Sequence, residues 1–402
     1  MPVTRTPISF ALFLIAAAPP APAQQKAALT RPDATFDEPF TSITSLHEVA
    51  PGKVLVSDVQ DKIVQLVDLS RGTALKVGRE GQGPGEYGMP AGLFGLPNGQ
   101  TLLQDLMNRR FLAIGADGKP GAILDYPRPP ATPEREPGPP GMVIGGLGGV
   151  TSVRNVDAQG RLYFQGLPFR GLNQPALDSV PILRWDRVKP TFDTLGYVKV
   201  ASGSASARGG AGRVEVRIGG GKVFAPADGW DVTPDGRLAR VTPDPFRVLW
   251  TTGGGKWTPG PTLAYKPIPV TEKDKEAERE RRSRARPMMI VQGGPGGRAP
   301  AAPPNPQGQE PEFEPVKPPF ESGFGLGGRT VYATPDGEIW VLRTRPAGDN
   351  TPSYDVFDRT GALVKRVTLN PRSRIVGFGN GTVYVARSDE DDLLYLERYR
   401  KP

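Results

Sequence analysis

His47 is the only histidine in this chain of 402 residues, and cysteine is absent. One imidazole cannot build a multi-histidine metal site, and without cysteine there is no thiolate ligand or thiol nucleophile. Glu48, Asp157 and Asp231 lie in or beside expected strands, and carboxylate oxygens suit calcium or magnesium. Their spacing does not bring them together by itself. We therefore predict no catalytic residue, no metal ligand and no cofactor, with His47 as a packed side chain and a divalent cation as the alternative.

Arginine and tyrosine, residue types enriched at binding hot spots, gather around one glycine-rich segment. It reads Gly78-Arg79-Glu80-Gly81-Gln82-Gly83-Pro84-Gly85-Glu86-Tyr87. Its glycines permit positive φ in a tight connection, and Glu86 can accept hydrogen bonds from backbone amides there. No Gly-Lys-Ser/Thr follows, so the segment is not a phosphate-binding loop. The residues that we predict to bind a ligand are Arg79, Glu86, Tyr87, Arg109 and Arg170.

These candidates must be positioned by a repeated element, a turn that ends in glycine and leads into a mostly apolar run. The turns are Pro51-Gly52, Asn98-Gly99, Gln159-Gly160, Asp235-Gly236, Asp336-Gly337 and Asn380-Gly381. Recurrence at a spacing of tens of residues is typical of repeat architectures, and four short strands per unit make a propeller blade. Continuous apolar runs such as Val383-Tyr384-Val385 indicate strands that are covered on both faces.

We predict an all-β fold, a six-bladed β-propeller closed by an N-terminal strand. The predicted blades span residues 42–77, 91–126, 150–200, 224–270, 330–369 and 375–399. The last blade lacks a fourth strand after residues 393–399, whereas residues 27–40 remain unassigned at the other end of the chain. We expect this N-terminal segment to supply the missing outer strand, because closure removes an exposed sheet edge.

The long connections run mainly from the last strand of one blade to the first strand of the next, and these emerge on one face. The longest is residues 271–328, a charged and Pro/Gly-rich low-complexity insertion between blades four and five. Loops on a rigid scaffold commonly carry function. The loop-rich face is therefore the predicted binding surface.

The first 23 residues have the pattern of a signal peptide. Arg5 precedes an apolar stretch at residues 8–18, and Ala21-Pro22-Ala23 follows as a cleavage site. We assign residues 1–23 to the signal peptide and residues 24–402 to the propeller. The stretch is shorter than the roughly 20 apolar residues that a spanning helix needs, so we expect no transmembrane segment.

The amino-acid composition indicates where the protein is located and which kinds of partner it has. Zero cysteines in an exported chain of this size fit a bacterial envelope, so we expect a periplasmic or extracellular protein. The formal net charge of +8 is a modest excess, and export disfavours nucleic acid as a partner. We expect a monomer whose ligand is a protein, a peptide or a glycan.

The glycine-rich segment, followed by Pro90, Asp105 and Asn108-Arg109-Arg110, resembles the NHL-repeat consensus. It is still more similar to bacterial exported six-bladed propellers related to NHL proteins. Asp58 with Asp61-Lys62 repeats the same pattern one blade earlier. The resemblance implies a six-bladed ring, and relatives include protein-binding scaffolds, RNA-binding modules, and lyases or lactonases with a metal in the central channel.

Two functions compete on these observations. We favour an exported, non-enzymatic binding or interaction protein that uses the loop-rich face, because residue types suited to catalysis are scarce. The alternative is a hydrolase or lyase of the lactonase-like kind that depends on a metal in the central channel. A divalent cation bound to the purified protein would discriminate between them.

Overall fold

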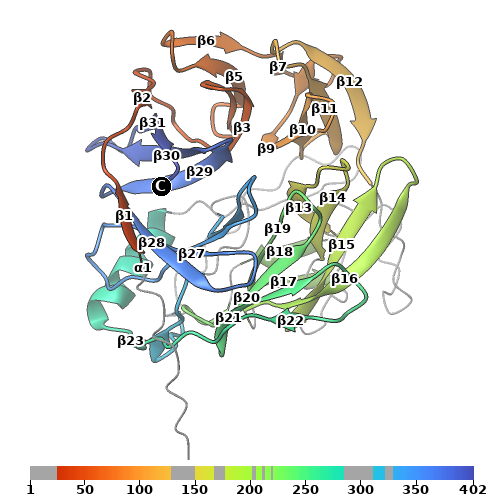
Figure 1. The fold of residues 1–402 in the computed structure, drawn as a ribbon. Helices are drawn as coiled ribbons and strands as arrows, with labels where there is room; N and C mark the ends of the chain where they lie inside the picture. Colours follow the sequence, from red (N-terminus) through yellow and green to blue (C-terminus); the bar gives the residue numbers. More distant parts are fainter. Residues whose placement is uncertain are drawn as a thin grey trace, which may run out of the picture.

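The fold is a ring of β-sheets, shown in Figure 1 for the computed structural model. The structure describes residues 25–127, 150–166, 177–201, 205–210, 213–218, 221–284, 311–321 and 329–402. Six sheets of four or five strands surround a centre, which confirms the predicted six-bladed β-propeller. The predicted signal peptide lies outside the described residues.

Each blade is a meander whose first strand lines the centre of the ring. Blade one contains β3 (Ser45–Ala50), β4 (Lys53–Asp58), β5 (Ile63–Asp68) and β6 (Thr73–Lys76). Blade two contains β9 (Pro90–Gly95), β10 (Thr101–Asp105), β11 (Arg110–Ile114) and β12 (Pro120–Asp125). Blade three contains β13 (Val150–Val156), β14 (Leu162–Gly166), β15 (Ser179–Asp186) and β16 (Thr191–Lys199).

The second half of the chain repeats this order. Blade four contains β19 (Gly229–Val232), β20 (Leu238–Pro243), β21 (Phe246–Thr251) and β22 (Thr258–Pro259). Blade five contains β25 (Val331–Ala333), β26 (Ile339–Leu342), β27 (Ser353–Phe357) and β28 (Leu363–Leu369). Blade six contains β29 (Ser373–Gly379), β30 (Thr382–Ser388) and β31 (Leu394–Arg400).

The turn glycines explain why each blade starts as it does. All six have positive φ, between 70° for Gly381 and 86° for Gly337, a region in which residues with a Cβ are strained. The turn between the first two strands of every blade is therefore encoded locally.

Apolar side chains hold neighbouring blades together. A buried cluster occupies every blade interface: Leu55 with Leu103 between blades one and two, for example, and Tyr384 with Val54 between blades six and one. Burial on both faces of the sheets explains the continuous apolar runs in the sequence.

The N-terminal segment closes the ring, as predicted, but it divides between two blades. The strand β2 (Ala34–Thr35) pairs with β31 as the fourth strand of blade six, and Phe40 continues this pairing opposite Leu394. The strand β1 (Gln25–Leu29) instead runs parallel to β28 and becomes a fifth strand of blade five. The N-terminal segment therefore joins the last two blades as well as completing the ring.

The insertion after blade four carries the one helix among the described residues, α1 (Glu272–Arg284), which is neither long nor apolar enough to cross a membrane. Thr271 and Asp274 cap its first turn reciprocally, through Asp274 N–H to Thr271 Oγ1 at 3.3 Å and Thr271 N–H to Asp274 Oδ2 at 2.9 Å. Asp274 also forms a buried ion pair with Lys317 of β24 (Val316–Lys317), which pairs with β23 (Ile268–Pro269). This contact fixes the helix to the ring.

Two further short strand pairs lie outside the six blade sheets. The strands β7 (Arg79–Glu80) and β8 (Glu86–Tyr87) pair within the glycine-rich segment, and β17 (Ala205–Gly210) pairs with β18 (Arg213–Ile218).

Candidate functional site: an arginine cluster in the central channel

The inner strands β3, β9, β13, β19, β25 and β29 each leave one edge without a partner strand, and side chains cross these edges from blade to blade. At each of the six interfaces a side chain of one blade bonds a backbone group on or beside the neighbouring inner strand. The pairs are Leu93 N–H to Ser45 Oγ (2.9 Å), Val153 N–H to Gln104 Oε1 (3.3 Å), Arg154 Nε to Trp230 O (3.0 Å), Ala333 N–H to Asp231 Oδ2 (2.7 Å), Tyr332 OH to Ile375 O (2.7 Å) and Arg374 Nη2 to Ile43 O (2.7 Å).

Three of these six bonds involve a charged side chain, and the anionic one is Asp231 of β19. This carboxylate is fully buried. Oδ1 accepts hydrogen bonds from the N–H of Val232 at 2.9 Å, from Asn155 Nδ2 at 3.2 Å and from Arg329 Nη2 at 3.1 Å, while Oδ2 accepts the N–H of Ala333 at 2.7 Å. Both oxygens are therefore occupied by the protein itself.

Arg154 of β13 is the most desolvated cation of the cluster. Its guanidinium donates to the carbonyls of Trp230, at 3.0 Å, and Val331, at 2.9 Å. Burial and then the neighbouring Arg329 lower the pKa of Arg154 to about 10, against the opposing pull of Asp231. Even so, the group stays a cation at neutral pH.

Two more arginines surround Tyr332 of β25. Burial raises the pKa of the Tyr332 phenol, and Arg374, Arg329 and Arg154 are all close enough to oppose that rise. The guanidinium of Arg329 lies 5.7 Å from the Tyr332 ring, and its side chain is 34% exposed. Three guanidiniums thus lie around the Tyr332 phenol, and Arg329 also pairs with Asp231, which leaves the cluster with an excess of positive charge.

The predicted carboxylates do not converge with Asp231. Glu48 accepts hydrogen bonds from the N–H of Asn380 at 2.8 Å and from Tyr384 OH at 2.6 Å, so it ties blade one to blade six. Asp157 accepts from Arg161 Nε at 2.6 Å and Tyr163 OH at 2.8 Å within its own blade. Each stabilises a separate turn or interface.

His47 lies between blades one and two, where Nδ1 is 2.8 Å from Thr101 Oγ1. Burial lowers its pKa to about 4, although the neighbouring Glu48 opposes the shift. A Cβ on Gly95 would approach His47 Nε2 to 2.3 Å, so the glycine makes room for the ring. These contacts agree with the packed side chain predicted from the sequence.

The predicted ligand-binding residues have separate environments. Arg79 forms an exposed ion pair with Glu86 at 2.7 Å, and Glu86 also accepts the N–H of Gly83 at 2.8 Å, as the sequence predicts. Tyr87 is fully buried, donates to Val77 O at 2.8 Å and accepts the N–H of Val64 at 2.9 Å. In the described structure Tyr87 therefore fastens the glycine-rich segment to blade one.

Arg109 has a backbone φ of 52°, the same as Lys62 at the equivalent turn of blade one. The repeated Asp-Asp-Lys and Asp-Asn-Arg patterns thus mark one turn geometry in two blades. Arg170 lies outside the described residues.

The donor set of the channel cluster does not fit a divalent cation. Asp231 already accepts four hydrogen bonds, and guanidinium groups surround it. Among the described residues, no group of three or more His, Cys, Asp or Glu side chains is arranged to hold a metal ion. A calcium or magnesium ion needs several free oxygen ligands, and the described part of this site offers none to spare.

Sequence reasoning missed Arg154, Arg329 and Arg374. Each interrupts or borders an apolar inner strand, as in Val153-Arg154 and Arg374-Ile375. An arginine in a strand that is otherwise covered by neighbouring blades is a usable signal, because burying a charge is costly without partners.

Several solved structures align with most of this chain, at low sequence identity and with TM-scores below 0.5. A gluconolactonase from Xanthomonas campestris is 11% identical, covers 95% of this chain and 99% of its own, and has a TM-score of 0.42. The calcium-binding protein regucalcin from Agrobacterium tumefaciens is 10% identical, with coverages of 92% and 95% and a TM-score of 0.41. A streptogramin B lyase is 12% identical, with coverages of 91% and 86% and a TM-score of 0.38. No protein-family description and no curated protein matches the chain.

These comparisons correct the expectation of a non-enzymatic binding protein. The aligned structures are described as a gluconolactonase and a lyase, and neither description is that of a non-enzymatic binding protein. Because the identities are near 10% and the TM-scores lie below 0.5, the fold is established by the sheet topology, and the chemistry has to be argued from the residues of this chain.

Proposed function

We propose that this protein is a hydrolase or lyase of the lactonase-like kind, and that guanidinium groups stabilise the negative charge that its reaction develops. The observation that carries the proposal is the grouping of Arg154, Arg329 and Arg374 around Tyr332 on the inner strands, with Arg329 paired to Asp231. The substrate class is a small molecule with an ester bond, in a ring or open.

Ester cleavage places negative charge on an oxygen, whether water attacks the carbonyl or an elimination expels the carboxylate. Fixed hydrogen-bond donors in a partly desolvated site stabilise such an oxyanion. Arg329, whose side chain is 34% exposed, is assigned contact with the substrate. Asp231 and Arg154 act as positioning residues, because Asp231 orients the Arg329 guanidinium and Arg154 adds positive charge beside it.

Asp231 does not suit the role of general base. Its oxygens are buried and already accept hydrogen bonds from four donors. Because the donor set does not fit a divalent cation, no step of this proposal involves one. We therefore retain the hydrolase or lyase reaction of the alternative hypothesis, but not its dependence on a metal ion.

Turnover of a panel of lactones and aryl esters tests the proposal. We expect hydrolysis or ring opening by the wild-type protein, and a fall in kcat/KM of about a hundredfold for Arg329→Ala, the usual loss for one oxyanion donor. Arg71→Ala is the matched control, because that side chain is 76% exposed in the turn between the outer strands of blade one. Absence of turnover across the panel, or equal kcat/KM for Arg329→Ala and the wild type, would refute the assignment.

We also propose that the protein is exported and that it is related to the NHL-repeat propellers. The pattern of residues 1–23 supports export to the periplasm or beyond, and the glycine-rich segment supports kinship with NHL-related propellers. Arg79, Glu86 and Arg109 lie in exposed or half-buried positions near the connection between blades one and two. They are candidates for contacts with a ligand.

A further inference from the structure

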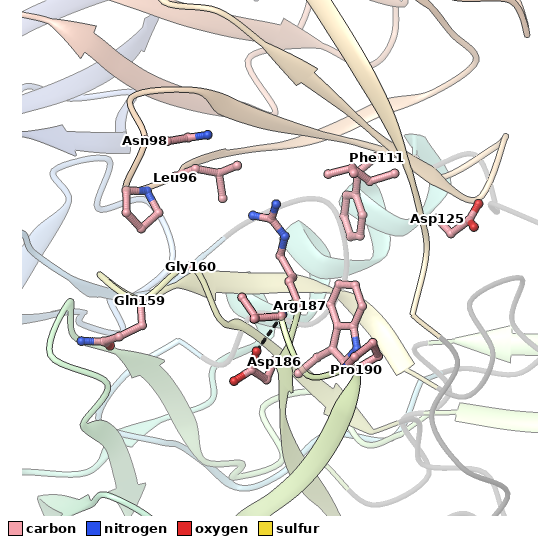
Figure 2. A pocket seen from close by; sticks show the side chains of 13 residues that line it. Leu96, Asn98, Phe111, Asp125, Gln159, Gly160, Asp186, Arg187 and Pro190 are labelled. Atoms are coloured by element: carbon pink, nitrogen blue, oxygen red, sulfur yellow. Dashed lines mark hydrogen bonds between the residues drawn. The ribbon is translucent and has the colours of Figure 1, made fainter.

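A cavity lies at the interface of blades two and three (Figure 2). Its volume is about 580 Å³, within the range of roughly 300 to 1,000 Å³ typical of small-molecule sites. The turn at Asn98 in blade two and the turn at Gly160 in blade three both border it.

The walls of this cavity are mostly apolar. They are formed by Leu96, Pro97, Phe111, Trp185, Val188 and Pro190. The buried cluster between blades two and three includes Leu96 and Phe111, and Trp185 packs against its margin. The Trp185 ring also stacks on Phe192 with centroids 6.4 Å apart, which holds the indole in place. The inner wall of the cavity therefore belongs to the interface core, and the cavity opens to solvent at the exposed side chain of Val188.

The Arg187 side chain brings a positive charge to this mostly apolar cavity. Figure 2 shows the Arg187 side chain extending between the blade-two wall and the turn of blade three. The side chain is half-buried, and its guanidinium has no hydrogen bond or ion pair with any residue in the described part of the chain. Neighbouring arginines differ: Arg161 pairs with Asp157 at 2.6 Å, and Arg184 pairs with Asp193 at 2.7 Å.

An unpaired guanidinium beside aromatic walls favours a ligand with one carboxylate. The planar fork of N–H donors matches a carboxylate in two parallel hydrogen bonds, and partial desolvation strengthens the pairing. Asp125 and Asp186 also line the cavity and repel any anion, so one carboxylate paired with Arg187 is favoured over a doubly charged anion. Asp186 is turned to its own backbone, accepting the N–H of Val188 at 2.8 Å and of Lys189 at 3.1 Å.

We propose that the cavity between blades two and three binds an amphipathic monocarboxylate, with its apolar body against Phe111 and Trp185 and its carboxylate on Arg187. This site lies apart from the channel cluster, and it stands whether or not the proposed function is correct.

Calorimetric titration of the full chain with 3-phenylpropionate and with its neutral amide, 3-phenylpropanamide, tests this site. We expect saturable binding of the acid and at least about tenfold weaker binding of the amide, the usual contribution of one charge-assisted hydrogen-bonded pair. Arg187→Gln should abolish the preference for the acid. Lys189→Gln is the control, because it removes the same charge from the same turn, and Lys189 does not line the cavity.

Three results would overturn the proposal: no saturable binding of the acid at millimolar concentration, equal binding of acid and amide to the wild type, or an equal loss of preference in Lys189→Gln. The last would mean that the general positive charge of the turn attracts the acid. The melting temperature of each variant, measured in parallel, shows whether the fold is intact.

Discussion

The guanidinium of Arg374 in blade six donates a hydrogen bond of 2.7 Å to the carbonyl of Ile43, just before the first strand of blade one. The two residues are 331 positions apart, so this bond forms only when the ring closes. It belongs to a belt of side-chain-to-backbone bonds that occupies all six inner-strand interfaces. Ring closure and the positive charge of the channel therefore depend on the same residues.

Arg374→Met should destabilise the closed ring, because the Ile43 carbonyl loses its donor. We expect a loss of about 1 to 3 kcal/mol in the free energy of unfolding, measured by urea denaturation. Arg71→Met is the control, since it removes only an exposed ion pair worth at most about 1 kcal/mol. Equal stability of the two variants would show that the bond to Ile43 contributes nothing to closure.

The lone histidine allows a direct measurement of its titration. The proton spectrum of a tag-free chain should show one histidine Cε1–H signal, moving with a pKa of about 4, well below the usual histidine value of 6.5. Because the folded pKa is lower, the unfolded state binds more protons between these values, so stability should fall as pH drops from about 6.5 toward 4. An observed pKa near 6.5 would mean that His47 is not buried between blades one and two.

Removing the cation of the Asp274–Lys317 pair should release the helix α1. Lys317→Met leaves Asp274 buried without its partner, and the usual loss on breaking a buried pair is about 3 to 5 kcal/mol. Hydrogen exchange should therefore speed up at the amides of α1 while the blades stay protected. Lys273→Met, at an exposed position of the same helix, should leave exchange unchanged. Unaltered protection of α1 in Lys317→Met would contradict this docking contact.

Two truncations separate the roles of the N-terminal strands. A chain that begins at Arg31 loses β1 and its pairing with β28, and it should remain a monomer. A chain that begins at Thr41 also loses β2 and the buried rings of Phe36 and Phe40, so the edge of β31 is exposed and we expect aggregation. Light scattering after size exclusion distinguishes them, and a monomeric, equally stable Thr41 chain would contradict the closure by β2.

Much of the fold could be predicted because its signals are local. Glycine at a turn, followed by an apolar run, specifies a hairpin within a few residues, and six such signals gave the six blades. The division of the N-terminal segment between two blades was not predictable in this way, since the pairing of Ala27 with Val367 joins residues 340 positions apart in the chain.

The channel cluster was missed for the same reason. Arg154 bonds Val331 across 177 positions, and only the packing of blade five against blade four brings Arg329 to Asp231. The sequence did point to Asp231, but as a ligand of a divalent metal ion in the alternative interpretation. In the structure, Asp231 is the ion-pair partner of Arg329. Tyr87 is the converse case, a residue that the sequence suggested for ligand binding but that is buried. Its hydroxyl bonds the backbone of Val77 and Val64 in the interior.

The initial rate of lactone or ester turnover after exhaustive chelation tests the central claim most directly. If guanidinium groups stabilise the developing charge, the metal-free protein should keep the rate of the untreated protein, and added calcium or magnesium should not raise it. A rate that is lost on chelation and restored by one of these ions would contradict the account, because the described donors around Asp231 leave no oxygen free to bind it.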